Sequence, residues 1–468
     1  MKTEIKNHMG LLYILLAGFF LFDPIIGFAD VLPDVIGYLL LCVGLTRLSD
    51  LNDALSEAAR RFRYMIWIGL GQLVATYILF VVMEETADKM NRYEQPVTVL
   101  LCSFSLLVLQ WYFLIPAFRD LFRGMGQLAE RHGSTVLCKE DNKNKTRSER
   151  LSAKTTVWVI LSSLFSLLPE LSILTSFEHD AESTVFTFDW YRFIGLFRGA
   201  CGVVLAIIGV IWLVRYLRYV GAALGDGAFL ESLRTRYIEE ILPQTGMLTR
   251  RRFALAFLLI NVGAVFTVSL RINQYGVLPT LGFAVLIFLA LAHLGTLVPD
   301  PAPCKRACIA LGIVSVGNLF LNVSYLARFL PEASLYQADA YWHFFAWRVA
   351  GVCEALVTLI AVGMLLQTLW GIVRVHTEVN YGKNAVAISA DATDRLHRDF
   401  EKRLKIIFVI FLLAGIANAA DAVLFLSIPW IWIIALVLSI VGIWMLSSFL
   451  HELSQHIQNR YQNQGINE

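Results

Sequence analysis

The stretch "DVLPDVIGYLLL" (residues 30–41) places two aspartates and a proline inside an otherwise apolar run over 11–48. That run is about twice as long as one membrane-spanning helix, which needs about 20 apolar residues. Charged side chains are costly in the hydrocarbon core, so Asp30 and Asp34 predict a turn at the membrane surface. Pro33 suits the first turn of a second helix, where its missing N–H costs nothing. The stretch therefore predicts a hairpin of two spanning helices.

The composition of the whole chain favours the same class of protein. Of its 468 residues, 57% are hydrophobic and 16% are charged, whereas soluble domains carry about 25% charged residues. Apolar runs long enough to span a bilayer recur from end to end. We therefore predict an all-α, polytopic membrane helix bundle with about 12 transmembrane helices in six hairpins. The expected spans are 11–28, 32–48, 64–83, 97–117, 156–175, 191–216, 253–272, 279–298, 306–326, 345–370, 405–425 and 429–450.

The distribution of basic residues predicts the orientation of these spans. With the N-terminus inside, the inner segments hold 32 of the 39 Lys and Arg residues. The positive-inside rule associates such an excess with cytoplasmic loops. We therefore expect a plasma-membrane protein with both termini on the cytoplasmic side. The lack of outer glycosylation sequons and of organelle signals favours a bacterial membrane.

Two halves of six helices each are expected, residues 1–245 with a cytoplasmic loop at 133–154, and residues 246–468 with a loop at 374–404. Internal repeats are suggested by two alignments. Residues 31–51 align without gaps to 277–297, and 189–199 resemble 339–349 more weakly. The order of tight and wide hairpins does not divide into equivalent halves, which argues against a standard inverted-repeat transporter.

The periodicity predicts that three amphipathic segments continue spanning helices into the cytoplasm: 118–133, 216–240 and 447–462. Their apolar positions recur at helical spacing with Arg between them. Such helices lie along the inner leaflet, pack under the bundle or bind a partner protein. The sequence leaves these three alternatives open.

The motifs of common enzyme classes are absent. The "HELSQH" segment has its histidines, His451 and His456, at i and i+5, whereas a zinc-protease helix needs i and i+4 on one face. Neither a G-x-x-x-x-G-K-[ST] phosphate loop nor a G-x-S-x-G elbow occurs. Cys304 and Cys308 lack the second pair that a zinc site needs. We expect no enzymatic activity, no cofactor, no metal and, with a net charge of only +2, no nucleic-acid partner.

Polar residues inside the apolar spans are the candidates for a functional site. Glu354 lies nine residues into its span, about 13 Å from the outer end of the helix. An intramembrane carboxylate is costly and normally lies paired, protonated or in contact with water. We expect cross-helix ion pairs between Glu354 and Arg198 or Arg271. The expected outward-open cavity is lined by Glu354, Asp421, Arg198, Arg348, Arg271, Asn318 and Asn322.

An alternative is that these polar side chains only fix helix packing through interhelical hydrogen bonds and rim charges. The first functional hypothesis is transport of a small solute through the cavity between helices. The second is a non-catalytic membrane sensor, assembly factor or partner subunit. The expected partners are the lipid bilayer, a small-molecule solute, and a membrane or cytoplasmic protein.

Overall fold

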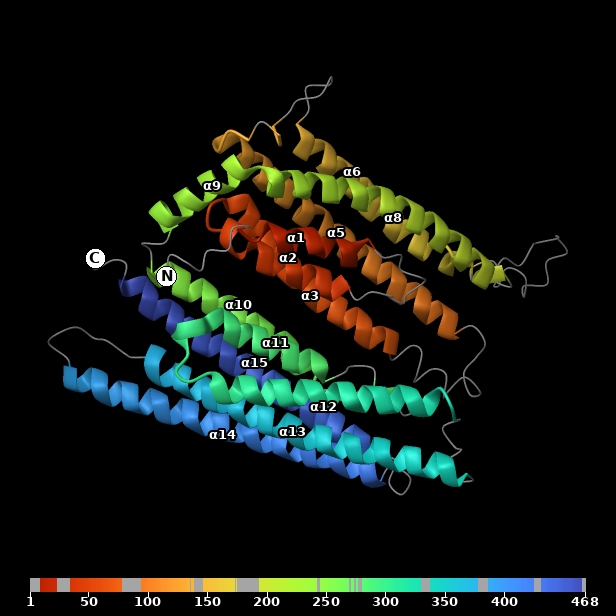
Figure 1. Cartoon of the computed structure of the whole chain (residues 1–468), viewed down its shortest axis with the longest axis vertical. Coiled ribbons are helices and arrows are strands. Elements are labelled where there is room, and N and C mark those ends of the chain that lie inside the picture. Colours follow the sequence, from red (N-terminus) through yellow and green to blue (C-terminus); the bar gives the residue numbers. More distant parts are fainter. Residues whose placement is uncertain are drawn as a thin grey trace. The chain divides into compact units, whose positions relative to one another are not determined.

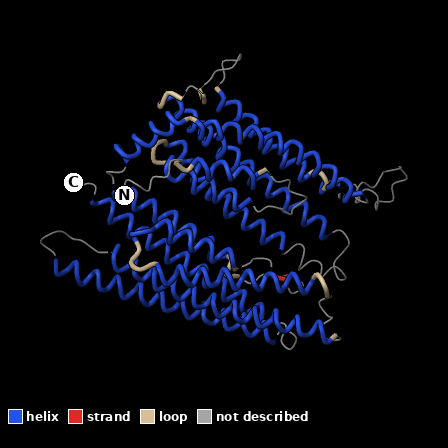
Figure 2. Tube along the Cα trace, viewed as in Figure 1, coloured by secondary structure: helices blue, strands red, loops and turns tan. Residues whose placement is uncertain are grey.

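The computed structural model describes most of the chain. The described residues are 9–22, 34–77, 94–134, 136–138, 146–172, 174, 193–241, 245–268, 271–272, 275–276, 280–329, 337–377, 386–424 and 431–464. Helices account for nearly all of them, and the remainder are short loops and one pair of two-residue strands (Figure 2). The chain divides into two compact units, Met1–Pro243 and Gln244–Glu468.

Among its described residues, unit 1 has six main helices with a short helical extension. The elements are α1 (Leu11–Leu21), α2 (Asp34–Leu48), α3 (Asp53–Tyr77), α5 (Glu94–Arg131), α6 (Arg147–Leu167), η3 (Glu170–Ser172), α8 (Ile194–Gly225), α9 (Gly227–Arg236) and the π-helical η5 (Tyr237–Ile241). Each main helix packs on the next, from α1 to α8, and α8 returns to pack on α1 (Figure 1). The described helices of unit 1 therefore form a closed ring.

Aromatic side chains fill the centre of unit 1. The rings of Trp158 and Trp212 stack with centroids 4.1 Å apart, and Tyr216 stacks on the other side of Trp212 at 5.2 Å. Trp212 also donates an indole hydrogen bond of 2.9 Å to Thr155, and Tyr216 donates one of 2.6 Å to the carbonyl of Ile14. The stack thereby ties α6 and α1 to α8.

Unit 2 also contains six main helices. Its elements are α10 (Thr245–Val265), β1 (Arg271–Ile272), β2 (Tyr275–Gly276), α11 (Leu281–Leu294), η6 (Gly295–Leu297), α12 (Ala302–Leu326), α13 (Ala338–His376), α14 (Val386–Leu424) and α15 (Ile431–Gln464). The strands pair antiparallel, with Arg271 opposite Gly276. Successive helices pack on one another, and α15 returns to pack on α10 (Figure 1).

Seven described helices are long and apolar enough to cross a membrane by length and composition: α5, α6, α8, α12, α13, α14 and α15. Large apolar side chains such as Leu196 and Ile207 on α8 are exposed, as lipid-facing residues are. Each of the twelve predicted spans overlaps a described helix. Since α1 and α11 are shorter apolar helices, the number twelve stays a prediction, as does the orientation.

The predicted cytoplasmic extensions are helical and pack within their own units. In unit 2, Leu453 and Ile457 of α15 are buried, and Tyr461 lies with its hydroxyl 2.8 Å from Nδ1 of His376 at the end of α13. In unit 1, Leu128 and Ala129 at the end of α5 are buried. Of the three alternatives that the sequence left open, packing against the bundle is the one that these described contacts support.

Candidate functional site

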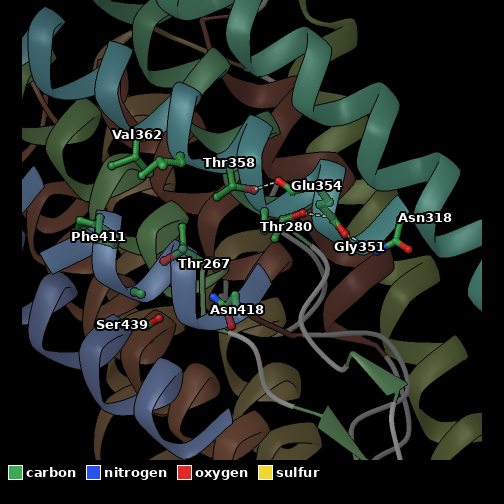
Figure 3. A pocket seen from close by; sticks show the side chains of 14 residues that line it. Thr267, Thr280, Asn318, Gly351, Glu354, Thr358, Val362, Phe411, Asn418 and Ser439 are labelled. Atoms are coloured by element: carbon green, nitrogen blue, oxygen red, sulfur yellow. Dashed lines mark hydrogen bonds between the residues drawn. The ribbon is translucent and has the colours of Figure 1, made fainter. Parts of the chain in front are cut away.

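A polar cavity of about 110 Å³ lies inside unit 2. Figure 3 shows Glu354 and Thr358 of α13 on one side, with Asn418 of α14 and Ser439 of α15 across the cavity. Its lining comprises Thr267, Thr280, Asn318, Gly351, Glu354, Ala355, Thr358, Leu359, Val362, Phe411, Ala414, Gly415, Asn418 and Ser439. These residues come from or adjoin all six helices of the ring, so the cavity depends on the closed bundle.

Glu354 lies seventeen positions into α13, a helix of 39 residues. The N-terminal part of α13 carries exposed aromatic side chains, Tyr341, Trp342 and Phe345, which are typical of a membrane interface. Glu354 is twelve residues beyond Trp342, or about 18 Å along the helix axis. A hydrocarbon core of about 30 Å would therefore place this carboxylate near its centre.

Two neutral side chains satisfy the Glu354 carboxylate. Thr280 donates to one oxygen through its hydroxyl, and Asn318 donates to the other through its amide (Figure 3). The hydroxyl oxygens of Thr280 and Ser315 lie 3.1 Å apart, within hydrogen-bonding distance. Ser315 also accepts a hydrogen bond of 3.0 Å from the N–H of Leu281. Thr280 is the N-cap of α11, where the partial positive charge of a helix end favours an anion.

The remaining polar groups of the cavity present oxygen atoms. Thr358 donates its hydroxyl hydrogen to the carbonyl of Glu354 at 2.7 Å, and Thr267 donates to that of Ala264 at 2.7 Å. Because both hydrogens are used on backbone carbonyls, the lone pairs of these hydroxyls remain free to accept or to coordinate. Asn418 and Ser439 also line the cavity.

The described contacts give Arg198 a carboxylate partner that the sequence did not suggest. Arg198 lies on α8 in unit 1 and pairs with Glu170 of η3 through two hydrogen bonds of 2.8 Å. No signal in the sequence pointed to Glu170, because a charged residue near the end of a predicted span is common. Pro169 precedes it, α6 ends at Leu167, and the following turn leaves Glu170 only 2% exposed.

The other predicted residues are distributed over several places in unit 2. Asn318 lies in the cavity beside Glu354, but Asn322, one turn further along α12, does not line it. Arg348 is buried with its guanidinium over the ring of Trp347, and Asp421 is buried in α14, both outside the cavity lining. Arg271 is in β1, and its side chain lies outside the described residues.

The additional cavity residues could have been found from helical spacing. On α13, positions 351, 354, 355, 358, 359 and 362 recur at intervals of three and four, which defines one helix face. On α14, Phe411, Ala414, Gly415 and Asn418 share the same spacing. Small residues beside a buried polar one on such a face indicate space between helices. Thr267 and Thr280 gave no comparable signal.

Thiol and metal chemistry find little support in the described residues. The seven cysteines are free, and no group of three or more His, Cys, Asp or Glu side chains is placed to hold a metal ion there. Cys304 and Cys308 are buried near the start of α12, where they contact each other across one helical turn.

A second, open hollow of about 790 Å³ lies in unit 1 where α5 ends beside α9 and η5. His132 lines it, with Nδ1 2.7 Å from the hydroxyl of Ser232 on α9. Burial and the positive charge of Arg236 lower the pKa of His132 below its usual 6.5. This histidine joins the end of α5 to the amphipathic helix that follows α8.

The lowered pKa of His132 predicts a pH dependence of stability. An unfolded histidine titrates near 6.5, so the neutral folded form contributes stability that is complete above that pH. The contribution falls as the pH drops through 6.5 and is fully lost below the folded pKa. Unfolding titrations at pH 7.5 and 5 should show this decline in the wild type and a smaller decline in His132→Gln. His451 is exposed, so His451→Gln should lose as much stability between pH 7.5 and 5 as the wild type does. An equal loss of stability in all three proteins would contradict the prediction.

Comparison of the chain with protein-family models, curated proteins and solved structures finds no match. The class of protein therefore rests on the fold and on the cavity alone. The described structure is almost entirely helical, and seven of its helices are long and apolar enough to span a membrane. Both findings are compatible with a multi-pass membrane protein.

Proposed function

We propose that the chain is a plasma-membrane protein of twelve spans, with both termini inside, that binds a small solute in the Glu354 cavity and transports it. The observation that carries this proposal is the cavity itself. It lies between helices of an apolar bundle and is partly open, and its lining combines a carboxylate, amides and hydroxyls with apolar side chains. Transporter sites typically lie near the bilayer midplane between helices.

Structural roles account for the cavity less well. Side chains that only fix packing would meet one another directly, as Ser163 and Gln110 do across α6 and α5 at 2.9 Å. Glu354 also meets Thr280 and Asn318 directly. Beside these contacts, however, Glu354 lines a space with room for several water molecules, which packing alone does not require. A polar space inside an apolar bundle costs stability, and binding of a solute would give it a function.

We also propose that the two units are tandem repeats of one six-helix plan. Both rings have the same order of packing, with the sixth helix returning to the first. The aligned segments 31–51 and 277–297 contain the second helix of each ring, α2 and α11. The weaker match of 189–199 with 339–349 joins the sixth helix of one ring to the fourth of the other, and it does not fit this plan.

Burial along the fourth helices supports the repeat. The helices α5 and α13 begin 244 residues apart, at Glu94 and Ala338. With the same offset, the eight buried positions within 117–129 coincide with the eight within 361–373. Neighbouring contacts also correspond. Asn52 before α3 bonds Gln127 at 2.9 Å, and Pro299 before α12 approaches Gly371, which is 244 residues beyond Gln127.

Solute binding can be tested by thermal stability in lipid nanodiscs. A library of small metabolites should contain a compound that raises the melting temperature, because a ligand of the folded state must stabilise it. Ser439→Leu, which fills the cavity, should abolish that rise. The matched control is Ile440→Leu, at the next position of α15, which is 53% exposed and should respond as the wild type. Flux of the identified compound into proteoliposomes then tests transport.

Two results would overturn this function. If no compound stabilises the wild type, or if Ser439→Leu responds as the wild type does, the cavity is not a solute site. The alternative of a sensor, assembly factor or partner subunit would then be preferred, and crosslinking would identify its protein partner. The described inner helices bury their apolar faces within their own units, which favours the solute hypothesis over this alternative.

The proposed topology has its own test. Inner loops are expected before the fifth and eleventh spans, so protease sites would be inserted at 139–145 and 378–385. Both sites should be cut only from the cytoplasmic side. Cleavage of the two sites from opposite sides would exclude tandem repeats of equal orientation.

A further inference from the structure

We infer that the Glu354 cavity takes a small monovalent cation, either an alkali metal ion or ammonium, as the solute or as its coupling ion. This inference rests on the proposed solute site and specifies its chemistry. It follows from the charge of the cavity, from the atoms that face it and from its size.

The charge of Glu354 has no basic partner in the described part of the chain. Its two hydrogen-bond donors, Thr280 and Asn318, are neutral. Of the described residues that line the cavity, Glu354 is the one ionisable group. Glu354 is half-buried, and a carboxylate without a compensating charge is costly in a membrane interior. A bound cation would supply the missing charge.

Oxygen atoms dominate the polar lining. Thr267 and Thr358 have their hydrogens engaged with backbone carbonyls, which leaves lone pairs for a ligand. Asn318 holds one oxygen of Glu354 through its amide nitrogen. Carboxylate, carbonyl and hydroxyl oxygens are the ligands that hard cations prefer.

The number of carboxylates favours a single positive charge. Sites for Ca²⁺ are usually built from several carboxylates, and this cavity offers Glu354 alone among its described lining. A monovalent ion would form a neutral pair with it, whereas a divalent ion would leave an excess charge inside the bundle. The volume of about 110 Å³ admits such an ion together with water.

The proposed repeat provides a neutral counterpart to this site. Gln110 of α5 lies 244 residues before Glu354, at the corresponding place on the fourth helix of unit 1. It is buried and accepts a hydrogen bond from Ser163. Glutamine at this place removes the need for a cation, so Glu354→Gln converts the unit 2 site to the unit 1 chemistry with little change of shape.

The test measures melting temperature in nanodiscs made from zwitterionic lipid, at constant pH and ionic strength. NaCl, KCl or NH₄Cl replaces N-methylglucamine chloride, whose cation is too large for the cavity. At least one of the small cations should stabilise the wild type in a saturable manner. The apparent affinity should fall by about tenfold or more in Glu354→Gln. Ser439→Ala, which removes one oxygen and is easily accommodated, should weaken binding less. Gln110→Leu is the control and should retain the full response.

The outcomes separate this inference from the proposed function. Suppose that no small cation stabilises the protein, but a neutral compound does and Ser439→Leu abolishes its effect. The inference is then overturned and the solute site stands. If only the pH matters and Glu354→Gln removes that dependence, the occupant is a proton and the inference is also overturned. If nothing binds, both proposals fail. An equal response to cations in the wild type and Glu354→Gln would show that the ions act elsewhere, which overturns the inference.

Discussion

Replacing Trp212 by alanine is expected to lower the free energy of unfolding by about 3–5 kcal/mol, the usual cost of truncating a buried tryptophan. The side chain is 3% exposed, stacks between Trp158 and Tyr216, and donates a hydrogen bond to Thr155. Truncation removes both stacking contacts and leaves a cavity between α6 and α8. Unfolding titrations in mixed detergent micelles measure the loss.

The control for this prediction is Trp444→Ala on α15. Trp444 is 71% exposed on an apolar helix, so its loss should change stability by less than about 0.5 kcal/mol. Trp212→Phe should retain part of the stacking, so its free energy of unfolding should lie between those of the wild type and Trp212→Ala. Similar values for Trp212→Ala and Trp444→Ala would contradict the packing of α8 against α6.

Arg198→Ala is the second substitution with a large expected effect, a loss of about 3 kcal/mol or more. The guanidinium makes two hydrogen bonds to Glu170, whose side chain is only 2% exposed. Removing the arginine leaves a buried carboxylate without its charged partner, which is the costly way to break an ion pair. The free energy of unfolding again gives the measurement.

The double variant Arg198→Met/Glu170→Met separates two contributions to the loss of stability. One is the loss of the ion pair itself, and the other is the burial of an unpaired carboxylate. Replacing both partners by apolar residues is often neutral or stabilising, so the double variant should be more stable than Arg198→Ala. The exposed pair of Arg60 and Glu57 is the control, because truncation of a surface pair typically costs at most about 1 kcal/mol. A double variant as unstable as the single one would contradict the assignment of Glu170 as the partner.

The helices were predictable from the sequence to a greater degree than their contacts. Each expected span overlaps a described helix, because a long apolar run satisfies its backbone hydrogen bonds within itself. Helix ends were less predictable. The helical continuations of α5 and α15 follow the predicted amphipathic segments. The cytoplasmic loop expected at 374–404 is wrong over much of its length, because α14 begins at Val386 and α13 ends at His376. Asp30 and Pro33 of the first predicted turn lie outside the described residues, and Asp34 is the first residue of α2.

The candidate site was predictable in its central residue and in one neighbour. Glu354 was identifiable because a carboxylate in an apolar helix is rare, and Asn318 because it is polar on a spanning helix. The arginines were assigned to the same cavity by their depth alone, and Arg198 belongs instead with Glu170 in unit 1. Depth along the membrane is a property of sequence position, whereas the direction of a side chain depends on how its helix is rotated.

The sequence by itself determined that this protein is a bundle of long apolar helices with a costly carboxylate in one of them, because hydropathy and helical periodicity are local properties. Only the tertiary structure decided that Thr280 and Asn318 meet Glu354, that Asn418 and Ser439 face it across a cavity, and that Glu170 turns inward. Those contacts join residues far apart in the chain. They depend on the packing of six helices at once, which no local pattern specifies.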